Sequence, residues 1–277
     1  MLVAFRGEAG LSPEPSPPPV KSAARALALV EFVAAEGKTS FMDILRSLGL
    51  PRSSTHELLQ TLTSTGWLEH DPRSKLYSLG LRAWQVGELY RGHRNLADIA
   101  KPVMDRLAHT VGETVQLARL DGIENVYIAI SESEQAMRLA SRVGGRLLAH
   151  ATGLGKALLS MVEPSDVERR LRSLQLPQYT EKTITDVDRL MVIIGEARRN
   201  GYALDDEEYM SGCRCVAVPL TDEESGVLSA MSISMPTSRT DEGWPESFMI
   251  PLATAAHEIR SVLGVSEPKL PTISVSS

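Results

Sequence analysis

The stretch "GLPRSSTHELLQTLTSTGWLEHDPRSKLYSLG", residues 49–80, decides the fold of the front part of this 277-residue chain. Its first half has the spacing of a helix over residues 52–64, with Leu58, Leu59 and Leu62 on the buried side. Stepping 100° per residue from that side places Thr55 inward and a polar set outward. The outward residues are Ser53, His56, Glu57 and Gln60. Periodicity alone does not say what they face, because a polar helix face is usually just solvated.

The second half of the stretch predicts a hairpin with a basic tip. "WLEH" and "LYSL" have the composition of strands, and "DPRSK" between them presents Arg73 and Lys75. Upstream, Ser40 is placed to cap a helix over residues 41–48, and the turn "GLP" joins this helix to the next. Two short helices followed by a hairpin are typical of a winged helix-turn-helix, in which the second helix enters the major groove and the wing contacts phosphates. A small helical domain with a solvated face is the alternative.

A further helix is predicted in front of these elements, in "SAARALALVEFVAAEGK". We expect Leu27, Val30 and Ala34 to lie on its buried face, and Gly37 to end it. Residues 1–20 contain the Pro-rich segment "SPEPSPPP", which predicts a disordered tail. Their apolar part is too short, and their charge too low, for a signal peptide.

Charge is distributed unevenly along the chain. Residues 20–95 carry ten Lys and Arg against seven Asp and Glu, whereas residues 96–277 carry eighteen against twenty-six. A basic front part favours an anionic partner there. The two cysteines, Cys213 and Cys215, project from one side of an extended segment, a poor geometry for a disulfide. Since no apolar run approaches the length of a membrane span, we expect a soluble, cytoplasmic protein of two domains.

A long helical stretch, "LGLRAWQVGELYRGHRNLADIAKPVMDRLAHTVG", follows the hairpin, with an interruption near Gly92. Its first part carries more apolar surface than one domain needs, through Leu81, Trp84, Val86, Leu89 and Tyr90. It is either a packing helix or part of an interface.

Strands and helices alternate in the remainder of the chain. "ETVQLARLDGIENVYIAIS" predicts a hairpin around an Asp121-Gly122 turn, and "RCVAVPLTDEESGVLSAMSISMP" predicts a second hairpin. Helices are predicted from the glycine turn in "HATGLGKALLS", in "TDVDRLMVIIGEARRNGYAL" and in "SFMIPLATAAHEIRSVLG". Locally paired strands with helices gathered on a face predict an α+β domain with an antiparallel sheet.

Several separate motifs give the chain a specific resemblance over about residues 21–265. "ARALALVEF", the stretch quoted first, "HATGLGKALLS", "GYALDDEEYMSGCRCVAVPL" and "SISMPTSR" resemble the IclR (isocitrate-lyase regulator) family of bacterial transcriptional regulators. The resemblance implies a winged helix-turn-helix DNA-binding domain at 21–80 and a linker helix at 81–95 that takes part in dimerisation. It further implies a GAF-like effector-binding domain at 96–265, followed by a flexible tail at 266–277.

With this resemblance, the polar face of the second helix is expected to meet DNA. The candidate DNA-binding residues are Arg52, Ser53, Ser54, His56, Glu57, Gln60, Arg73 and Lys75. Glu57 is a departure, because the family commonly has a basic residue after the histidine. A carboxylate there cannot hold a phosphate, although it could accept a hydrogen bond from cytosine N4 or turn to solvent. We therefore expect an altered operator preference at one position.

The candidate effector site combines three features, each with a plain alternative. Gly153 and Leu154 begin a helix whose N–H groups would attract a carboxylate, although glycines equally serve tight packing. Ser232 and Ser234 share one strand face opposite Met231 and Ile233, and their spacing alone favours solvent exposure over a polar cavity. Asp205 lies in an acidic run typical of a solvated loop, and a lone Cys215 is typical of a core. The resemblance implies that six positions contact a small organic acid: Gly153, Leu154, Asp205, Cys215, Ser232 and Ser234.

Four more residues lie near this predicted site. We guess that Leu148 or Met137 lines its apolar part, and expect His150 to be structural rather than part of the rim. Cys213 is a second departure from the family, since it adds a thiol that could alter the pocket lining or its sensitivity to metals. No metal ion or cofactor is expected.

These features together predict a ligand-responsive transcription regulator, taken as a repressor, that binds operator DNA. One recognition helix reads only a few base pairs, so we expect a homodimer on a two-fold site, and the resemblance implies dimers of dimers. The effector would be a short oxo acid, an aromatic acid or a related acyl compound. One alternative is an enzyme with Cys215 as nucleophile assisted by Asp205 and His150, although no nucleophile elbow or P-loop is present. A sensor that has lost DNA binding through Glu57 is the other.

Overall fold

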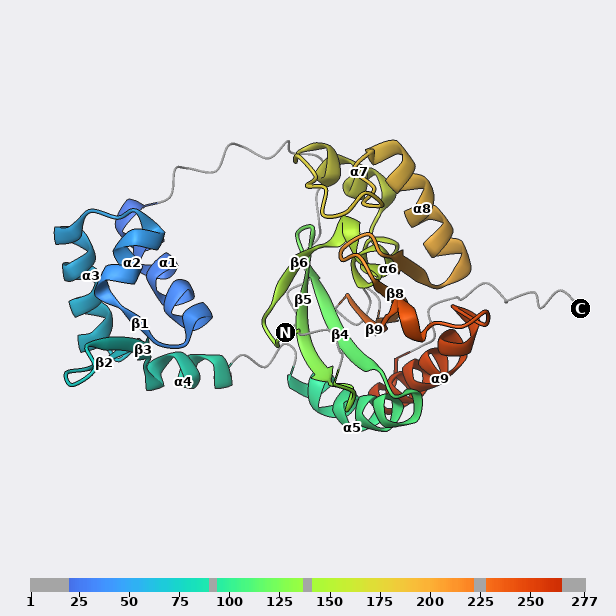
Figure 1. Cartoon of the computed structure of the whole chain (residues 1–277), viewed down its shortest axis with the longest axis horizontal. Helices are drawn as coiled ribbons and strands as arrows, with labels where there is room; N and C mark the ends of the chain where they lie inside the picture. The colour runs from blue at the N-terminus through green and yellow to red at the C-terminus, as the bar shows by residue number, and fades with distance from the viewer. Residues whose placement is uncertain (1–19, 90–93, 137–140, 222–227, 266–277) are drawn as a thin grey trace, which may run out of the picture. The chain divides into compact units, whose positions relative to one another are not determined.

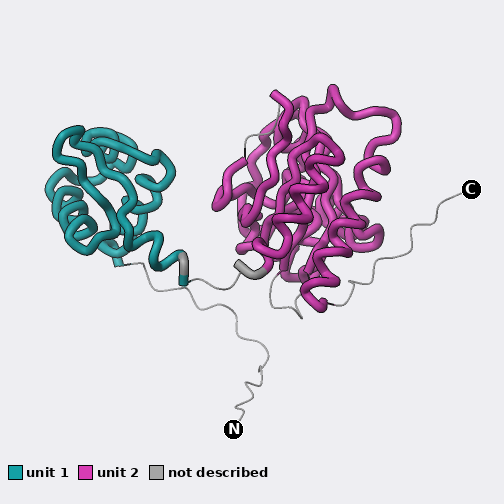
Figure 2. Tube along the Cα trace, turned by 90° about the horizontal axis from the view of Figure 1, so that it is seen from below, with its two compact units in different colours: residues 1–90 teal, residues 91–277 magenta. Residues whose placement is uncertain are grey.

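The chain folds into two compact units that divide between Tyr90 and Arg91 (Figure 2). The computed structural model describes residues 20–89, 94–136, 141–221 and 228–265. The predicted tails at residues 1–20 and 266–277, except for residue 20, and the interruption near Gly92 lie outside the described residues. The predicted linker at 81–95 is divided between the units, because the helix at residues 81–89 belongs to the first and the helix from residue 94 to the second.

The first unit is a winged helix-turn-helix, as predicted (Figure 1). Its elements are α1 (Lys21–Glu36), β1 (Thr39–Ser40), α2 (Phe41–Leu48), α3 (Arg52–Ser64), β2 (Leu68–Asp71), β3 (Leu76–Leu79) and α4 (Leu81–Leu89). The strands form a small antiparallel sheet in the order β1-β3-β2. Ser40 caps α2 by accepting the N–H of Asp43 at 3.2 Å. The first unit therefore combines the two helices and the wing that the quoted stretch predicts.

The face that α1 buries differs from the predicted one. Leu29 and Val33 are fully buried in the core of the unit, and Val30 is half-buried against it, as predicted. Leu27 is 64% exposed and Ala34 lies at the surface. The prediction was wrong for these two residues because "RALALVEFVAA" is apolar around most of the helix, so the spacing matches more than one face. Packing against α2 and α3 selects the face.

Gly80 connects the wing to α4 through a close backbone approach. A Cβ at this position would lie 2.2 Å from the carbonyl oxygen of Gly66, so only glycine fits here. The N–H of Gly80 donates to the Trp67 carbonyl at 2.8 Å, and the N–H of Arg82 donates to the Gly66 carbonyl at 3.1 Å. These bonds attach the start of α4 to the winged helix.

The second unit is an α+β domain around one antiparallel sheet, as predicted. Its helices are α5 (Arg94–Val111), α6 (Gly153–Leu159), α7 (Pro164–Arg172), α8 (Val187–Asn200) and α9 (Glu246–Leu263), with short 3-10 turns at Ala149–Ala151 and Thr237–Arg239. Its strands are β4 (Thr114–Asp121), β5 (Glu124–Ser131), β6 (Arg146–Leu148), β7 (Ala203–Asp206), β8 (Cys213–Thr221) and β9 (Ser229–Pro236). The strand order is β6-β5-β4-β9-β8-β7. Both predicted hairpins are present, and Asp121 pairs with Glu124 across the first turn.

Helices cover both faces of this sheet, not one face as predicted (Figure 1). α5 and α9 pack on one face, where Val216 of β8 and Ile233 of β9 join their core. α6 packs on the other face against Ala217 and Ala230. Alternation along β8 and β9 therefore separates two buried environments instead of a core from solvent.

Candidate functional site

α3 presents the polar face that its spacing predicts. Arg52, Ser53, His56, Glu57 and Gln60 are all exposed, whereas the side chain of Thr55 is fully buried. The Thr55 hydroxyl donates to the Pro51 carbonyl at 2.9 Å. Ser54 is half-buried and donates to the same carbonyl at 3.1 Å, so it is the least available of the predicted DNA-binding residues on this helix.

Phe41 of α2 supports two residues of this polar face. The Arg52 guanidinium lies 5.4 Å from the centroid of the Phe41 ring, within the range of a cation–π interaction. The His56 ring meets the same phenyl ring edge-on, with centroids 6.3 Å apart. Phe41 is half-buried against the core of the first unit. The structure shows that its ring also restricts the positions of two candidate DNA-contacting side chains.

The wing tip is organised by Asp71. Its carboxylate accepts the Ser74 hydroxyl at 2.6 Å and the Arg73 N–H at 2.9 Å, and these hydrogen bonds lower the pKa of Asp71. Its carbonyl oxygen accepts the Lys75 N–H at 2.8 Å. Such an Asx turn fixes a short loop. Arg73 and Lys75 are therefore exposed on a defined turn, where the hairpin pattern predicts them.

The surface of α4 is unusually apolar. Four large side chains on it are between 45% and 75% exposed: Leu81, Trp84, Val86 and Leu89. Exposed apolar side chains gathered on one helix are typical of an interface with another chain.

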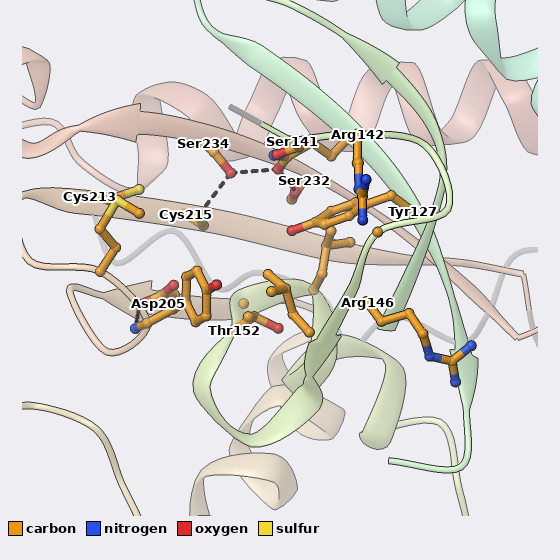
Figure 3. Close-up of a pocket in the computed structure, with 17 residues that line it drawn as sticks. Tyr127, Ser141, Arg142, Arg146, Thr152, Asp205, Cys213, Cys215, Ser232 and Ser234 are labelled. Carbon is orange, nitrogen blue, oxygen red and sulfur yellow. Dashed lines mark hydrogen bonds between the residues drawn. The ribbon is translucent and has the colours of Figure 1, made fainter. Parts of the chain in front are cut away.

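A cavity of about 270 Å³ opens on the α6 side of the second sheet (Figure 3). It brings together all six predicted effector residues, from α6, β7, β8 and β9. Its other lining residues are Gln116, Tyr127, Ser141, Arg142, Gly145, Arg146, Leu147, Thr152, Tyr209, Met210 and Cys213. Arg142 and Arg146 lie at one end in Figure 3, and Asp205 and Cys213 at the other.

Hydrogen bonds connect the polar wall of the cavity. The amide oxygen of Gln116 accepts the hydroxyls of Ser232 at 3.1 Å and Ser234 at 2.7 Å, while its amide nitrogen donates to Ser141 at 2.7 Å. The Cys215 sulfur lies 2.9 Å from the Ser234 oxygen. Because the single hydroxyl proton of Ser234 points to Gln116, the Cys215 thiol is the donor in this contact. Both serines are buried, so the exposed strand face favoured by spacing alone is wrong.

Asp205 is buried at the end of the cavity, not part of a solvated loop as its acidic neighbours suggest. Only 2% of the residue is exposed, and its carboxylate accepts the N–H groups of Glu208 at 2.7 Å and Tyr209 at 3.4 Å. Burial raises the pKa of Asp205 to about 7, although the nearby Lys156 charge opposes the rise. Near neutral pH, Asp205 can therefore accept or donate a hydrogen bond to a ligand.

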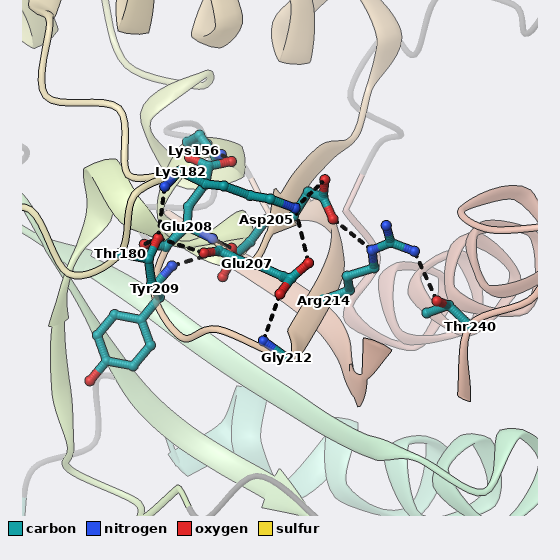
Figure 4. A network of polar contacts seen from close by, with 11 residues as sticks. Lys156, Thr180, Lys182, Asp205, Glu207, Glu208, Tyr209, Gly212, Arg214 and Thr240 are labelled. Atoms are coloured by element: carbon teal, nitrogen blue, oxygen red, sulfur yellow. Dashed lines mark hydrogen bonds and ion pairs between the residues drawn. The ribbon is translucent and has the colours of Figure 1, made fainter. Parts of the chain in front are cut away.

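A network of charged groups holds the segment that follows Asp205 (Figure 4). Lys156 of α6, which is 1% exposed, forms an ion pair with Glu208. The Glu207 carboxylate accepts the N–H of Gly212 at 2.7 Å, and also receives Lys182 at 2.9 Å. This network fixes the segment carrying Tyr209 and Met210, which line the cavity.

The first turn of α6 forms one side of the cavity. Thr152 caps the helix by accepting the N–H of Gly155 at 2.9 Å, and its hydroxyl donates to Asn125 at 2.9 Å. A Cβ on Gly155 would lie 2.2 Å from Ala149, so this glycine serves tight packing. Gly153 lines the cavity, and a Cβ added there would lie 3.5 Å from the Cβ of Cys215, an ordinary contact distance. Tight packing therefore requires glycine at position 155 but not at position 153.

Other residues near the predicted site lie elsewhere or contribute differently. His150 is buried against Tyr179 with its Nε2 3.0 Å from the Pro177 carbonyl; burial lowers its pKa, and it is structural, as expected. Leu148 does not line the cavity, whereas its neighbour Leu147 does, so that guess was wrong. Met137 lies outside the described residues.

The cavity also contains residues that sequence reasoning missed, among them Gln116, Tyr127 and Ser141. A signal existed for Gln116, because it interrupts the apolar run of "TVQLARL" between Val115 and Leu117, which are fully buried. Tyr127 had no such signal. Burial raises its pKa far above the ordinary value, so its hydroxyl stays protonated and can donate.

A winged helix with an exposed polar recognition helix, joined to a domain with a polar ligand cavity, defines a DNA-binding regulator that responds to a small molecule. The family described as "Bacterial transcriptional regulator IclR C-terminal" matches residues 89–261, and "IclR helix-turn-helix domain" matches residues 22–72. The chain belongs to the IclR family of transcription regulators. Since these regulators are not enzymes, the nucleophile alternative is wrong. The neighbouring Cys213 thiol and burial also raise the pKa of Cys215, which disfavours the thiolate that a nucleophile needs.

Similarity to characterised relatives extends along nearly the whole length. The chain is 34% identical to the HTH-type transcriptional regulator XynR of Escherichia coli over 89% of this chain and 98% of that protein. It is 33% identical to the transcriptional repressor IclR of Escherichia coli, over 88% and 90% respectively. Among solved structures, an IclR homologue from Microbacterium hydrocarbonoxydans complexed with 4-hydroxybenzoate is 28% identical, with a TM-score of 0.77 over 88% of this chain and all of that one.

Two properties of the described residues bear on other classes of function. None of their helices is long and apolar enough to cross a membrane. Nor do they contain a group of three or more His, Cys, Asp or Glu residues arranged to hold a metal ion.

Proposed function

We propose that this protein is a repressor that binds operator DNA as a homodimer and is controlled by a small organic acid. The observation that carries the proposal is the buried polar wall around Gln116, which faces a cavity in a protein with an exposed recognition helix. A relative of similar length is named a transcriptional repressor, which supports the sign of regulation.

The DNA contacts of the proposal come from two elements. His56, Glu57 and Gln60 of α3 would meet base edges in the major groove, while Arg73 and Lys75 of the wing would contact phosphates. Arg52 would contact the backbone near the start of α3. Glu57 is exposed, and thus available to accept a hydrogen bond from cytosine N4.

The polarity of the cavity favours an acid that carries a second polar group. Arg142 lies at one end and would attract a carboxylate there, whereas the guanidinium of Arg146 is held by Asp121 at 2.5 Å and Glu124 at 2.8 Å. Ser141, which accepts from Gln116, keeps its own O–H to donate. The N–H groups of Gly153 and Leu154 would add donors along the wall. Asp205 at the other end would pair with a hydroxyl or carbonyl oxygen. A volume of about 270 Å³ suits a ligand near the size of an aromatic acid.

The exposed apolar surface of α4 supports dimerisation. Leu81, Trp84 and Leu89 would be removed from water by a second copy of the helix, each contributing about 25 cal/mol per Å² of buried apolar area. A dimer places two recognition helices on a two-fold operator. A dimer of dimers would engage two such sites.

DNA binding is tested by titrating the protein onto DNA upstream of its own coding region, at two salt concentrations, with scrambled DNA as control. Sequence-dependent binding that weakens steeply with salt is expected, because phosphate contacts release counterions. Equal affinity for both DNAs, persisting in a random-sequence selection, would support the alternative of a sensor that has lost DNA binding. Replacing Glu57 by Arg and repeating the selection tests the expected preference: an unchanged consensus would contradict it.

Ligand binding is tested with a panel that removes one polar group at a time. We expect 4-hydroxybenzoate to bind more tightly than benzoate, which lacks the hydroxyl, and 4-hydroxybenzyl alcohol, which lacks the carboxylate. Calorimetry on the full chain measures the affinities, and operator release follows the same titration. Pyruvate tests the smaller oxo acids. Tighter binding of the alcohol than of either benzoic acid would contradict the proposal of an acid effector.

A further inference from the structure

Cys213 and Cys215 place two thiols side by side at one end of the cavity (Figure 3). Both cysteines are free and buried, and both line the cavity. Arg214 between them points to the opposite side of β8, where its guanidinium contacts Asp206 at 2.6 Å and the Trp244 ring at 4.6 Å. The Cys213 sulfur lies 3.8 Å from the Arg214 carbonyl oxygen, and the Cys215 sulfur 2.9 Å from the Ser234 hydroxyl. They therefore form a dithiol pair that faces an enclosed space.

The strand geometry prevents this pair from closing into an ordinary disulfide. Residues two apart on a strand are separated by about 6.6 Å along its axis and their side chains project in parallel. A disulfide requires Cβ atoms about 3.5–4.5 Å apart. β8 cannot shorten easily, because it is hydrogen-bonded to β7 through Cys215 and Asp205 and to β9 through Cys215 and Ser234.

A larger bridging atom removes this restriction. Because both side chains project from the same face of β8 into the cavity, each thiol can turn toward one atom between them and bond it at about 2.3 Å, the length of a typical metal–thiolate bond. A tetrahedral metal such as zinc needs further ligands, and the described residues offer no group of three metal-binding side chains. A linear two-coordinate cation needs its sulfurs on opposite sides, which neighbouring thiols of one strand do not provide. The bridging atom that fits is therefore one with pyramidal geometry, which forms two bonds to sulfur at a narrow angle.

We propose that Cys213 and Cys215 form a binding site for trivalent arsenic compounds that carry one organic substituent. The two thiols bond the arsenic, and the substituent extends into the cavity toward Tyr127, Tyr209 and Leu154. An aryl group would pack there against aromatic and aliphatic walls. The adduct would lie next to Asp205 and Ser234, so it would exclude a ligand from that end of the cavity.

The condensation balances without an oxidant or a reductant. An arsenoxide, R–As=O, gives up its oxygen, and each thiol gives up one proton. Two As–S bonds form, and the oxygen leaves as water with both protons. Arsenic stays trivalent and both sulfurs keep their oxidation state.

The test uses the reduced full-length protein and phenylarsine oxide. Trypsin cleaves after Arg214, between the two cysteines, so a bridging arsenic keeps the peptides 200–214 and 215–239 joined. Mass spectrometry is expected to show one phenylarsenic group per chain and, after denaturation and digestion, the joined peptides. The adduct should survive excess glutathione, a monothiol, and be removed by a dithiol.

Two matched variants complete the experiment. Cys213→Ser and Cys215→Ser each leave one thiol, and each is expected to lose the adduct in glutathione while its circular dichroism stays that of the wild type. An adduct that survives glutathione in either folded variant would overturn the proposal. The proposal would also be overturned if the wild type formed no adduct, or if digestion of its adduct gave the two peptides separately. These wild-type results do not depend on how the variants fold.

Discussion

Gln60 and Gln116 carry the same side chain, yet Gln60 is exposed on α3 while Gln116 is buried in β4 with its amide oxygen and nitrogen both hydrogen-bonded. Ser53 and Ser234 differ in the same way. In the first unit, polar side chains of α3 are exposed to solvent and available to a macromolecular partner. In the second unit, polar side chains bond one another and surround a space for a small ligand. The first arrangement costs the fold little, whereas the second depends on every partner being present.

The largest expected effect comes from breaking the buried ion pair of the second unit. Lys156→Met leaves the Glu208 carboxylate buried without its cation, and should cost about 3–5 kcal/mol of unfolding free energy. Arg46→Met in the first unit removes a pair whose side chains are 78% and 54% exposed, and should cost less than about 1 kcal/mol. Urea unfolding measures both. The double variant Lys156→Met/Glu208→Leu should regain most of the loss; no recovery would show that the pair is not the cause.

A second effect concerns pH. The pKa of Asp205 is about 7 in the fold against an ordinary 3.8, so between these values the folded protein binds more protons than the unfolded chain. The stability contribution of Asp205 is therefore lost as pH rises from about 4 to 7, at about 1.4 kcal/mol for each pH unit in that range. Asp205→Asn should remove this fall, so the variant gains on the wild type between pH 5 and pH 8. A difference in urea midpoint that stays constant with pH would contradict the raised pKa of Asp205.

The two glutamines give a direct test of the comparison. Gln116→Leu leaves the hydroxyls of Ser232 and Ser234 without their acceptor and should destabilise the fold by about 1–3 kcal/mol. Gln60→Leu should change stability by less than about 0.5 kcal/mol. Operator affinity should respond in the opposite order, with a loss of about 1–3 kcal/mol for Gln60→Leu if its amide reads a base. Equal losses of unfolding free energy in the two variants would contradict the claim that Gln116 stabilises the fold more than Gln60 does.

The smallest expected effect concerns Phe41. Phe41→Leu keeps an apolar side chain but removes the ring that Arg52 and His56 contact, and should weaken operator binding by about 0.5–1 kcal/mol. Phe41→Tyr keeps the ring and should restore the affinity. If both variants lose affinity equally while their urea midpoints match the wild type, the ring does not position these side chains.

The accuracy of the sequence-based prediction differs between the two units, because their polar residues face different surroundings. The outward residues of α3 could be predicted because one face of a small domain necessarily meets solvent, and three leucines mark the other face. The buried face of α1 could not, since Leu27 and Leu29 are equally apolar and only packing separates them. The ends of helix α3, Arg52–Ser64, were predictable because a turn with a proline precedes the helix and a glycine follows it.

The ligand cavity was predictable only through the family resemblance. Alternation along β9 assigns Ser232 and Ser234 to one face, but nothing local tells whether a helix covers that face. Gln116 meets the two serines through a register between strands that are more than one hundred residues apart in sequence. This register forms only when the sheet assembles, so local sequence patterns do not predict it.

The sheet of the second unit is a partition one peptide thick. On β9, Ser232 and Ser234 face the cavity, while Met231, Ile233 and Met235 face the core beneath α5 and α9. A change of side-chain volume in that core would displace the serines without touching a ligand. Substitutions at Met231, Ile233 or Met235 can therefore change which effector is preferred, although these residues do not contact the ligand.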